Sequence, residues 1–136
     1  MNFLAQVIGF ISFIISLTTY HKNKKNNILK NSILVNFLKL VHYLLLDAYS
    51  GFTTKIIAII RDSFIILKEK YKFLNNKIFF LIFVIVYILS ALITYKNIIS
   101  LFPIFAALTY TIVIWNGTEK EIKKIALLGY FLWLIY

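Results

Sequence analysis

Polar and charged side chains recur inside an apolar segment of the chain, residues 32–51, SILVNFLKLVHYLLLDAYSG. When successive residues are turned by about 100°, as in an α-helix, five of them fall within a stripe about 80° wide. They are Ser32, Asn36, Lys39, Tyr43 and Asp47. His42 lies about 60° beyond the edge of this stripe. Because amide, ammonium and imidazole groups bind polar solutes or pair with one another, the stripe predicts a polar face on an otherwise apolar helix.

A second charged group, Arg61 and Asp62, stands inside the next apolar segment. If the two segments form antiparallel helices, a rise of about 1.5 Å per residue places Lys39, Arg61 and Asp62 at one level, roughly 15 Å from the outer end. A charge at the middle of a bilayer costs at least about 2.5 kcal/mol, so such residues face a bundle interior or a wet cavity and are paired. We therefore expect a structural ion pair between Lys39 and Asp62, and a weaker pair between Asp47 and Lys55.

Two interpretations of this layer remain open. In the first, Asn36, Lys39, His42 and Arg61 line a cavity between the two helices and bind a solute. Two cations against one anion leave an excess positive charge, which favours an anionic or carboxylate-bearing solute. In the second, Lys39 and Asp62 only hold the helices together, while Arg61 extends to the cytoplasmic headgroups.

The residue types do not support a disulfide, a metal site, a catalytic triad or a nucleic-acid groove. The chain has no cysteine, which excludes disulfides and thiolate metal sites, and its two histidines do not make a metal site. Ser, His and Asp residues show no spacing typical of a catalytic triad. The formal charge of +10 comes from lysines that stand between apolar runs, whereas a nucleic-acid groove interleaves them with aromatic residues. We expect neither an enzyme nor a metal, cofactor or nucleic-acid site.

The composition predicts an integral membrane protein. Of 136 residues, 61% are hydrophobic and only 15% are charged, and the mean hydropathy is +0.85. Six apolar segments have lengths near the roughly 20 residues that cross a bilayer. They lie at about residues 3–20, 31–49, 52–68, 78–95, 98–115 and 122–136. We expect an all-α transmembrane bundle of six helices forming one domain over 1–136, because helices satisfy their own backbone hydrogen bonds in lipid.

The lysines predict how the helices are oriented. Eleven fall in the first, third and fifth loops, at positions 22, 24, 25, 30, 68, 70, 72, 77, 120, 123 and 124. Lys96 and Lys55 stand on the opposite side. By the positive-inside rule the lysine-rich loops are cytoplasmic, so the N-terminus is outside. The first segment has no positive residue before its apolar run, unlike a signal peptide, and we expect it to stay as a membrane helix.

Two parts of the chain resemble each other loosely. Residues 17–43 and 108–136 each contain a Leu-Thr start, a lysine-rich turn, an apolar helix and a closing Tyr. This similarity predicts two parallel repeats separated by one inverting helix, although any two lysine-rich helical hairpins would look alike. Trp115 and Trp133, near segment ends, predict interfacial anchors. Pro103 predicts either a kink or a position in the first turn of its helix.

The segments AQVIGFISFIISLTTY and VHYLLLDAY and the dipeptide IR resemble the YgjV-type family of small bacterial inner-membrane proteins. The matching positions are Gln6, Gly9, Thr18, Thr19, His42, Leu45, Tyr49 and Arg61. The family is similar in architecture to the SWEET and PQ-loop transporters, in which three-helix repeats flank a linker helix. The resemblance therefore implies an inner-membrane bundle with one three-helix repeat, a linker helix and an incomplete second repeat.

The chain departs from this family at two places. Asp47 stands where the family usually has Gly, which implies that an acidic residue replaces a tight turn. The chain ends at FLWLIY, where the family continues with a further helix, so the uncovered second repeat predicts a homodimer. The expected function is a carrier of a small polar or anionic solute by alternating access. The alternative is a membrane scaffold or accessory protein that does not transport.

Overall fold

The computed structural model describes residues 3–19, 21–22 and 24–135 of the chain. The described residues form α-helices and short 3-10 helices and contain no β-strand. The elements are α1 (Phe3–Thr19), α2 (Lys25–Leu45), α3 (Tyr49–Lys70), η1 (Lys72–Leu74), α4 (Lys77–Thr94), η2 (Ile98–Leu101), α5 (Phe102–Asn116) and α6 (Glu119–Ile135). The predicted all-α bundle with six long apolar segments is confirmed.

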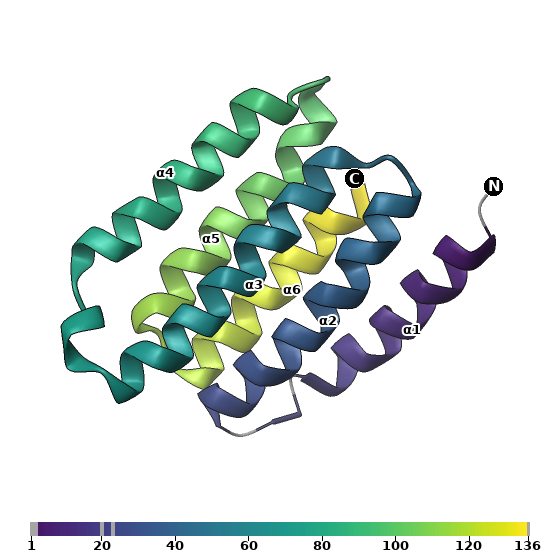
Figure 1. Ribbon diagram of the computed structural model, residues 1–136. Coiled ribbons are helices and arrows are strands. Elements are labelled where there is room, and N and C mark those ends of the chain that lie inside the picture. Colours follow the sequence, from purple (N-terminus) through teal and green to yellow (C-terminus); the bar gives the residue numbers. More distant parts are fainter. Residues whose placement is uncertain (1–2, 20, 23, 136) are drawn as a thin grey trace.

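The helices alternate in direction, so the connections gather at two ends of the bundle. Helices α1, α2 and α3 lie side by side in chain order, and α4 packs on α3 and α5 (Figure 1). Helix α6 pairs with α5, and its side chains contact α2 and α3. The α1–α2, α3–α4 and α5–α6 connections lie at one end, which is where the lysine-rich loops were expected to meet (Figure 1). The bundle therefore has two parts, α1 to α3 and the α5–α6 hairpin, joined by α4.

Helix α2 differs most from its predicted bounds. It begins at Lys25 and ends at Leu45, whereas the apolar run predicts 31–49. Its first turns are polar, and the Asn26 side chain donates a hydrogen bond to the carboxylate of Glu69 at the end of α3. Hydropathy marks only the apolar part of a helix, so a polar extension held by a neighbouring helix is missed. Helix α5 agrees better, and Pro103 lies in its first turn, where a missing N–H is tolerated.

A Schellman turn ends α2. Asp47 has a φ of 54°, the left-handed conformation that usually requires Gly. The N–H of Asp47 donates to the carbonyl of Leu44 at 3.2 Å, and the N–H of Ala48 donates to the carbonyl of Tyr43 at 3.0 Å. The tight turn is therefore present, with Asp47 at its left-handed position. The expectation that an acidic residue replaces the tight turn is wrong. Asp tolerates the left-handed region better than most residues because its short polar side chain can bond locally.

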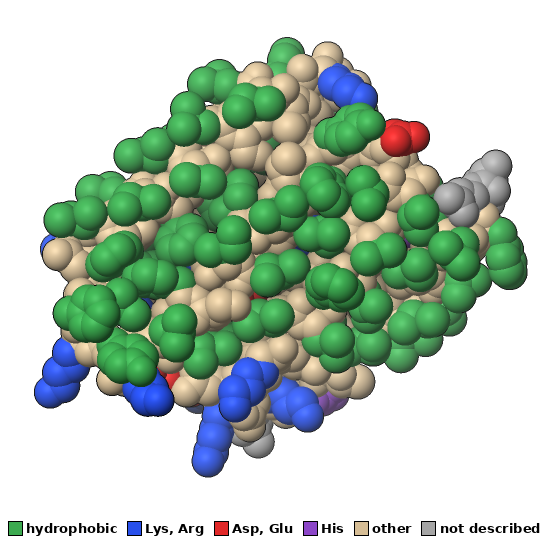
Figure 2. Space-filling view, in the orientation of Figure 1, with side chains coloured by type: hydrophobic (Ala, Val, Ile, Leu, Met, Phe, Trp, Pro, Cys, Tyr) green, Lys and Arg blue, Asp and Glu red, His purple; other side chains and the backbone are tan. Residues whose placement is uncertain are grey.

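Apolar residues fill the space between α3, α4 and α5 and cover the outside of the bundle. The buried core includes Ile57, Ile65, Phe83 and Ile114, with Trp115 only 5% exposed. On the visible face, hydrophobic side chains form a broad surface and Lys and Arg gather mainly along one edge (Figure 2). Such a large exposed apolar surface is expected where the solvent is lipid.

Three segments are long and apolar enough to cross a membrane by length and composition: Lys25–Leu45, Lys77–Thr94 and Ile98–Asn116. Helix α1 is equally apolar but has only 17 residues. Helix α3 carries Lys55, Arg61 and Asp62, and each of these side chains is at least nine-tenths buried. Its low hydropathy therefore comes partly from residues that face the bundle interior and partly from its polar last turn.

Candidate functional site

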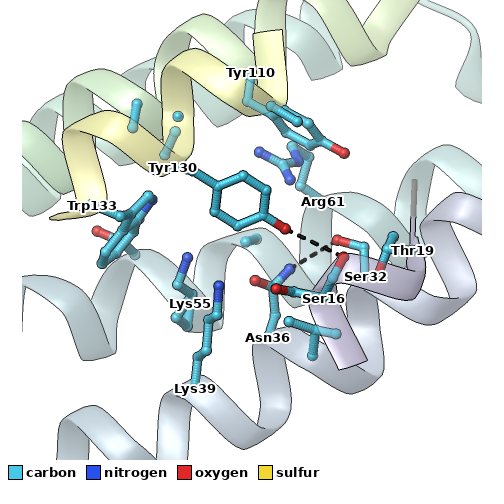
Figure 3. Close-up of a pocket in the computed structure, with 17 residues that line it drawn as sticks. Ser16, Thr19, Ser32, Asn36, Lys39, Lys55, Arg61, Tyr110, Tyr130 and Trp133 are labelled. Atoms are coloured by element: carbon cyan, nitrogen blue, oxygen red, sulfur yellow. Dashed lines mark hydrogen bonds between the residues drawn. The ribbon is translucent and has the colours of Figure 1, made fainter. Parts of the chain in front are cut away.

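A cavity of about 80 Å³ lies between the α1–α3 part of the bundle and the α5–α6 hairpin (Figure 3). Small side chains make the room for it, among them Ala58 of α3, Ala106 and Ala107 of α5, and Ala126 and Gly129 of α6. Its wall holds Ser, Thr, Asn, Lys, Arg, Tyr and Trp side chains. Because a site for one water needs only about 10–15 Å³ measured in this way, the cavity has room for several waters or one small solute.

Three cations line this cavity. Lys39 comes from α2, and Lys55 and Arg61 come from α3. Lys55 is 7% exposed and Arg61 is 2% exposed, so neither charge is in bulk solvent. No Asp or Glu is among the described residues that line the cavity. The wall therefore has basic side chains and no acidic side chain among the described residues that line it.

Arg61 is bound on several sides. Its Nε and Nη2 donate to Oδ1 of Asp62 at 2.9 and 2.6 Å, and its Nη1 donates to the hydroxyls of Tyr87 and Thr111 at 3.2 and 2.9 Å. These contacts connect α3 to α4 and α5. Because its charge is paired and most of its N–H groups are used, Arg61 joins helices and does not extend to the headgroups.

Asp62 is also bound on its second oxygen. Ser32 donates to Oδ2 at 2.7 Å and the amide of Asn36 donates at 3.4 Å. Among the described residues, the salt bridge within 4.0 Å joins Arg61 and Asp62. The expected ion pair between Lys39 and Asp62 is therefore wrong. Arg61 and Asp62 are neighbours on α3, and the guanidinium of Arg61 contacts the carboxylate that Lys39 of α2 was expected to bind.

The two lysines face aromatic rings of α6. The Nζ of Lys55 lies 3.6 Å from the centre of the Trp133 ring, and the Nζ of Lys39 lies 5.3 Å from the centre of the Tyr130 ring. Both side chains point toward the same part of the cavity (Figure 3). Neither ammonium group donates a hydrogen bond to any residue in the described part of the chain. Cation–π contacts attract a cation but leave its charge in place.

His42 lies outside this cavity. Its Nδ1 is 2.7 Å from the carbonyl oxygen of Ala5, and its ring fills the space beside Gly9, where an added Cβ would be 2.7 Å from Cε1. It borders a second, more open groove between α1 and α2, which Lys39 also borders. The structure therefore brings Asn36, Lys39 and Arg61 to one cavity and places His42 at a helix–helix contact.

The weaker expectations have mixed outcomes. Asp47 is exposed and lies beside the Tyr49 hydroxyl, whereas Lys55 is buried against Trp133, so the expected pair of Asp47 with Lys55 is not formed among the described residues. Trp115 belongs to the buried core and is not the exposed interfacial anchor predicted from its position, whereas Trp133 lies in the cavity wall and its role as an anchor stays a prediction.

Comparison with known proteins assigns the family. The model of the Imp-YgjV family, described as bacterial inner membrane protein, matches residues 3–136. The chain belongs to this family. No curated protein and no solved structure matches it. Several positions that resemble the family contact one another or share a wall: Gly9 meets His42 between α1 and α2, and Thr19 and Arg61 line the cavity.

The sequence interpretation missed Lys55, Tyr130 and Trp133 as parts of the site. A signal for Lys55 was present, because residues seven apart lie on nearly the same face of a helix and Lys55 precedes Asp62 by seven. Its place near the start of an apolar segment instead suggested the outer interface. The aromatic residues gave no such signal, since Tyr and Trp near a helix end are typical of interfacial belts.

Proposed function

We propose that this inner-membrane protein carries a small polar or anionic solute across the bilayer by alternating access. The observation that supports this most directly is the cavity beside Lys39 and Arg61, lined by polar groups from both parts of the bundle. A carrier needs a polar site at the boundary between two parts that can move against each other. Helix α4 joins those parts here, at the edge of the bundle away from α1 and α2 (Figure 1).

The charge of the cavity favours a solute that is negative. Arg61 and Asp62 neutralise each other, and Lys39 and Lys55 face the same space with no carboxylate within 4.0 Å of either ammonium group in the described part of the chain. A buried charge without a counter-ion is costly, and inside membrane proteins such residues mark ion or substrate pathways. Lipid tails cannot supply that counter-ion, whereas an anionic solute can.

The alternative function, a scaffold or accessory protein that does not transport, is favoured by the network around Arg61. Its bonds to Asp62, Tyr87 and Thr111 tie three helices together and need no solute. A scaffold of this kind would be packed and dry around the two lysines. Whether the chain works as the expected homodimer stays a prediction.

The test is uptake by proteoliposomes containing the purified protein. A broad panel of small labelled metabolites, anionic and neutral, is offered to the wild-type protein, to Lys39→Met and to Lys124→Met. Lys124 is an exposed residue of the first turns of α6 and serves as the matched lysine control. We expect uptake of at least one small solute that Lys39→Met lowers at least tenfold and Lys124→Met leaves unchanged. Uptake equal to that of empty liposomes across the panel would favour the scaffold.

A further inference from the structure

We infer that Lys39 and Lys55 form an anion-binding site and that its ligand is a small oxyanion, a carboxylate or an inorganic anion of about three to five non-hydrogen atoms. This inference rests on the proposed function for the passage of the ligand, and it names the ligand class and the binding residues. It assigns to Lys55 a binding role that the sequence pattern did not predict. Arg61 has a different role, because its bonds hold together the helices that form the wall of the site.

The first argument is that the three cations differ in the groups that contact them. Arg61 has a carboxylate and two hydroxyls around its guanidinium. Lys55 is 7% exposed and points into the cavity, where its ammonium group lies against the face of Trp133 and forms no salt bridge within the described part of the chain. A cation–π contact attracts the ammonium group but does not neutralise it, and a buried charge without a counter-ion is costly inside a membrane protein. The site is therefore incomplete without an anion or water at the ammonium group.

The second argument is the convergence of the two lysines. They come from different helices, and both point toward the Tyr130 side of the cavity (Figure 3). Like charges repel, and bringing two of them into one low-dielectric space is unfavourable unless something negative lies between them. An oxyanion has oxygens for both ammonium groups at once. Asn36 lies in the wall of the same cavity, and its amide donates a hydrogen bond to the Ser32 hydroxyl at 3.2 Å.

The third argument is size. The cavity is about 80 Å³, and an apolar cavity of about 150 Å³ is known to hold benzene, with six carbons. By proportion the space holds roughly three to five non-hydrogen atoms, the size of formate, acetate, nitrate or phosphate. Sugars and aromatic acids are too large for this conformation. Ala58, Ala106, Ala107 and Ala126 have no longer side chain whose rotation could enlarge the cavity while the helices stay in place.

Trp133 supplies a direct readout of binding. The chain has two tryptophans, and each lies against a lysine: Trp133 against Lys55, and Trp115 against Lys68 at 4.1 Å. An anion that engages Lys55 changes the electrostatic field at the Trp133 indole, so its fluorescence reports occupancy. Lys68 lies at the far end of α3 and outside the cavity lining, so it gives a matched lysine control.

The experiment titrates Trp115→Phe, in which Trp133 is the remaining tryptophan, with formate, acetate, nitrate, benzoate and glucose in detergent at constant ionic strength. We expect a saturable change in emission with at least one of the three small anions and none with benzoate or glucose. Lys55→Met and Lys39→Met, in the same background, should each weaken that binding at least tenfold. Lys68→Met should leave it within twofold.

A second measurement does not depend on the Trp115 substitution. The same anions should raise the melting temperature of the wild-type protein, because a ligand that binds only the folded state stabilises it, and the rise should vanish in Lys55→Met. Saturable binding without any uptake would leave this site standing and overturn the carrier. Uptake of a neutral solute with no response to any small anion would leave the carrier standing and overturn the anion site, as would binding that survives both lysine substitutions.

Discussion

Buried charges in this bundle differ in how completely their neighbours bind them. Arg61 and Asp62 form a 2.6 Å salt bridge, and hydroxyls from three helices complete their hydrogen bonds. Lys39 and Lys55 have aromatic faces instead. Removing one partner of a buried, bonded pair leaves the other charge uncompensated, whereas removing a cation from an aromatic face does not.

This difference predicts the outcome of a double-mutant cycle at the salt bridge. Arg61→Met and Asp62→Asn should each lower the free energy of unfolding by about 3–5 kcal/mol, because each leaves an unpaired buried charge. The double variant should lose clearly less than the sum of the two. Unfolding in mild detergent, followed by circular dichroism, measures all four members of the cycle.

The matched cycle uses Lys39→Met with Asp62→Asn. The structure gives these two residues no ion pair, so their effects should add within about 0.5 kcal/mol. A large coupling energy for Lys39 with Asp62, together with none for Arg61 with Asp62, would contradict the assignment of the pair.

Asp47 gives a second prediction at this scale. A non-Gly residue in the left-handed region pays roughly 1–2 kcal/mol, so Asp47→Gly should keep or raise the melting temperature and Asp47→Val should lower it. Leu46→Gly is the control in the same turn. Leu46 has a φ of −99°, so Gly there has no strain to relieve and should not stabilise. Equal effects of Gly at both positions would contradict the role of the turn.

At the residue scale the sequence predicted the buried positions of Arg61 and Asp62, but it missed Lys55 and did not predict which groups bind these charges. Depth along two antiparallel helices placed Lys39, Arg61 and Asp62 at one level, and Asn36, Lys39 and Arg61 do share a cavity. The choice of partner depends on side-chain rotamers and on the neighbouring Tyr87 and Thr111, and helical periodicity contains no such information.

Helix α1 is held on α2 by a close contact at Gly9. An added Cβ at this position would meet the His42 ring at 2.7 Å, and His42 in turn bonds to the carbonyl of Ala5. Gly129 of α6 has nothing within 4 Å of the position of an added Cβ. The two glycines therefore test the same substitution in opposite surroundings.

Gly9→Ala should lower the free energy of unfolding by about 1–3 kcal/mol, because the His42 ring must move and its bond to Ala5 is strained. Gly129→Ala should be neutral or stabilise by up to about 1 kcal/mol, since Ala is the better helix former. Thermal unfolding of both variants in one detergent makes the comparison. Equal tolerance at the two sites would show that α1 does not depend on this contact.

Element bounds were predicted well where hydropathy defines them and poorly where it does not. The expected 78–95 segment is close to α4, Lys77–Thr94, because both ends are marked by polar residues. The start of α2 was missed by six residues, since Asn26 and its neighbours extend the helix beyond the apolar run. The left-handed backbone conformation at position 47 could not be predicted either, because the residue there is Asp and not Gly.

For the whole molecule, the gathering of lysine-rich loops at one end predicts topology. In a six-crossing bundle with the N-terminus outside, the α1–α2 connection is cytoplasmic. Because the chain has no cysteine, Lys24→Cys provides one thiol in that connection. In inverted and right-side-out vesicles, a membrane-impermeant maleimide should label it only from the cytoplasmic side. Labelling from the outside would reject this orientation.

The bundle class, the family and a polar cavity beside Asn36, Lys39 and Arg61 could be predicted from the sequence, but the small residues that shape this cavity could not. Segment lengths and composition determine a helical membrane protein, and those features survive any rearrangement of side chains. The cavity depends on which small residues of α5 and α6 face Ala58, and thus on how the α5–α6 hairpin contacts α2 and α3. That packing arises from contacts far apart in the sequence.

The most direct test of a carrier is whether water reaches the cavity. Ala58→Cys places a thiol in the cavity wall, and Ile65→Cys places one two turns away on α3, in the dry core at 0% exposure. In membranes, the silver ion, an impermeant thiol reagent small enough for this cavity, should label position 58 and not position 65, and formate or acetate should slow the labelling. If position 58 stays unlabelled from both sides while position 24 is labelled, the cavity has no aqueous path and the carrier proposal is contradicted.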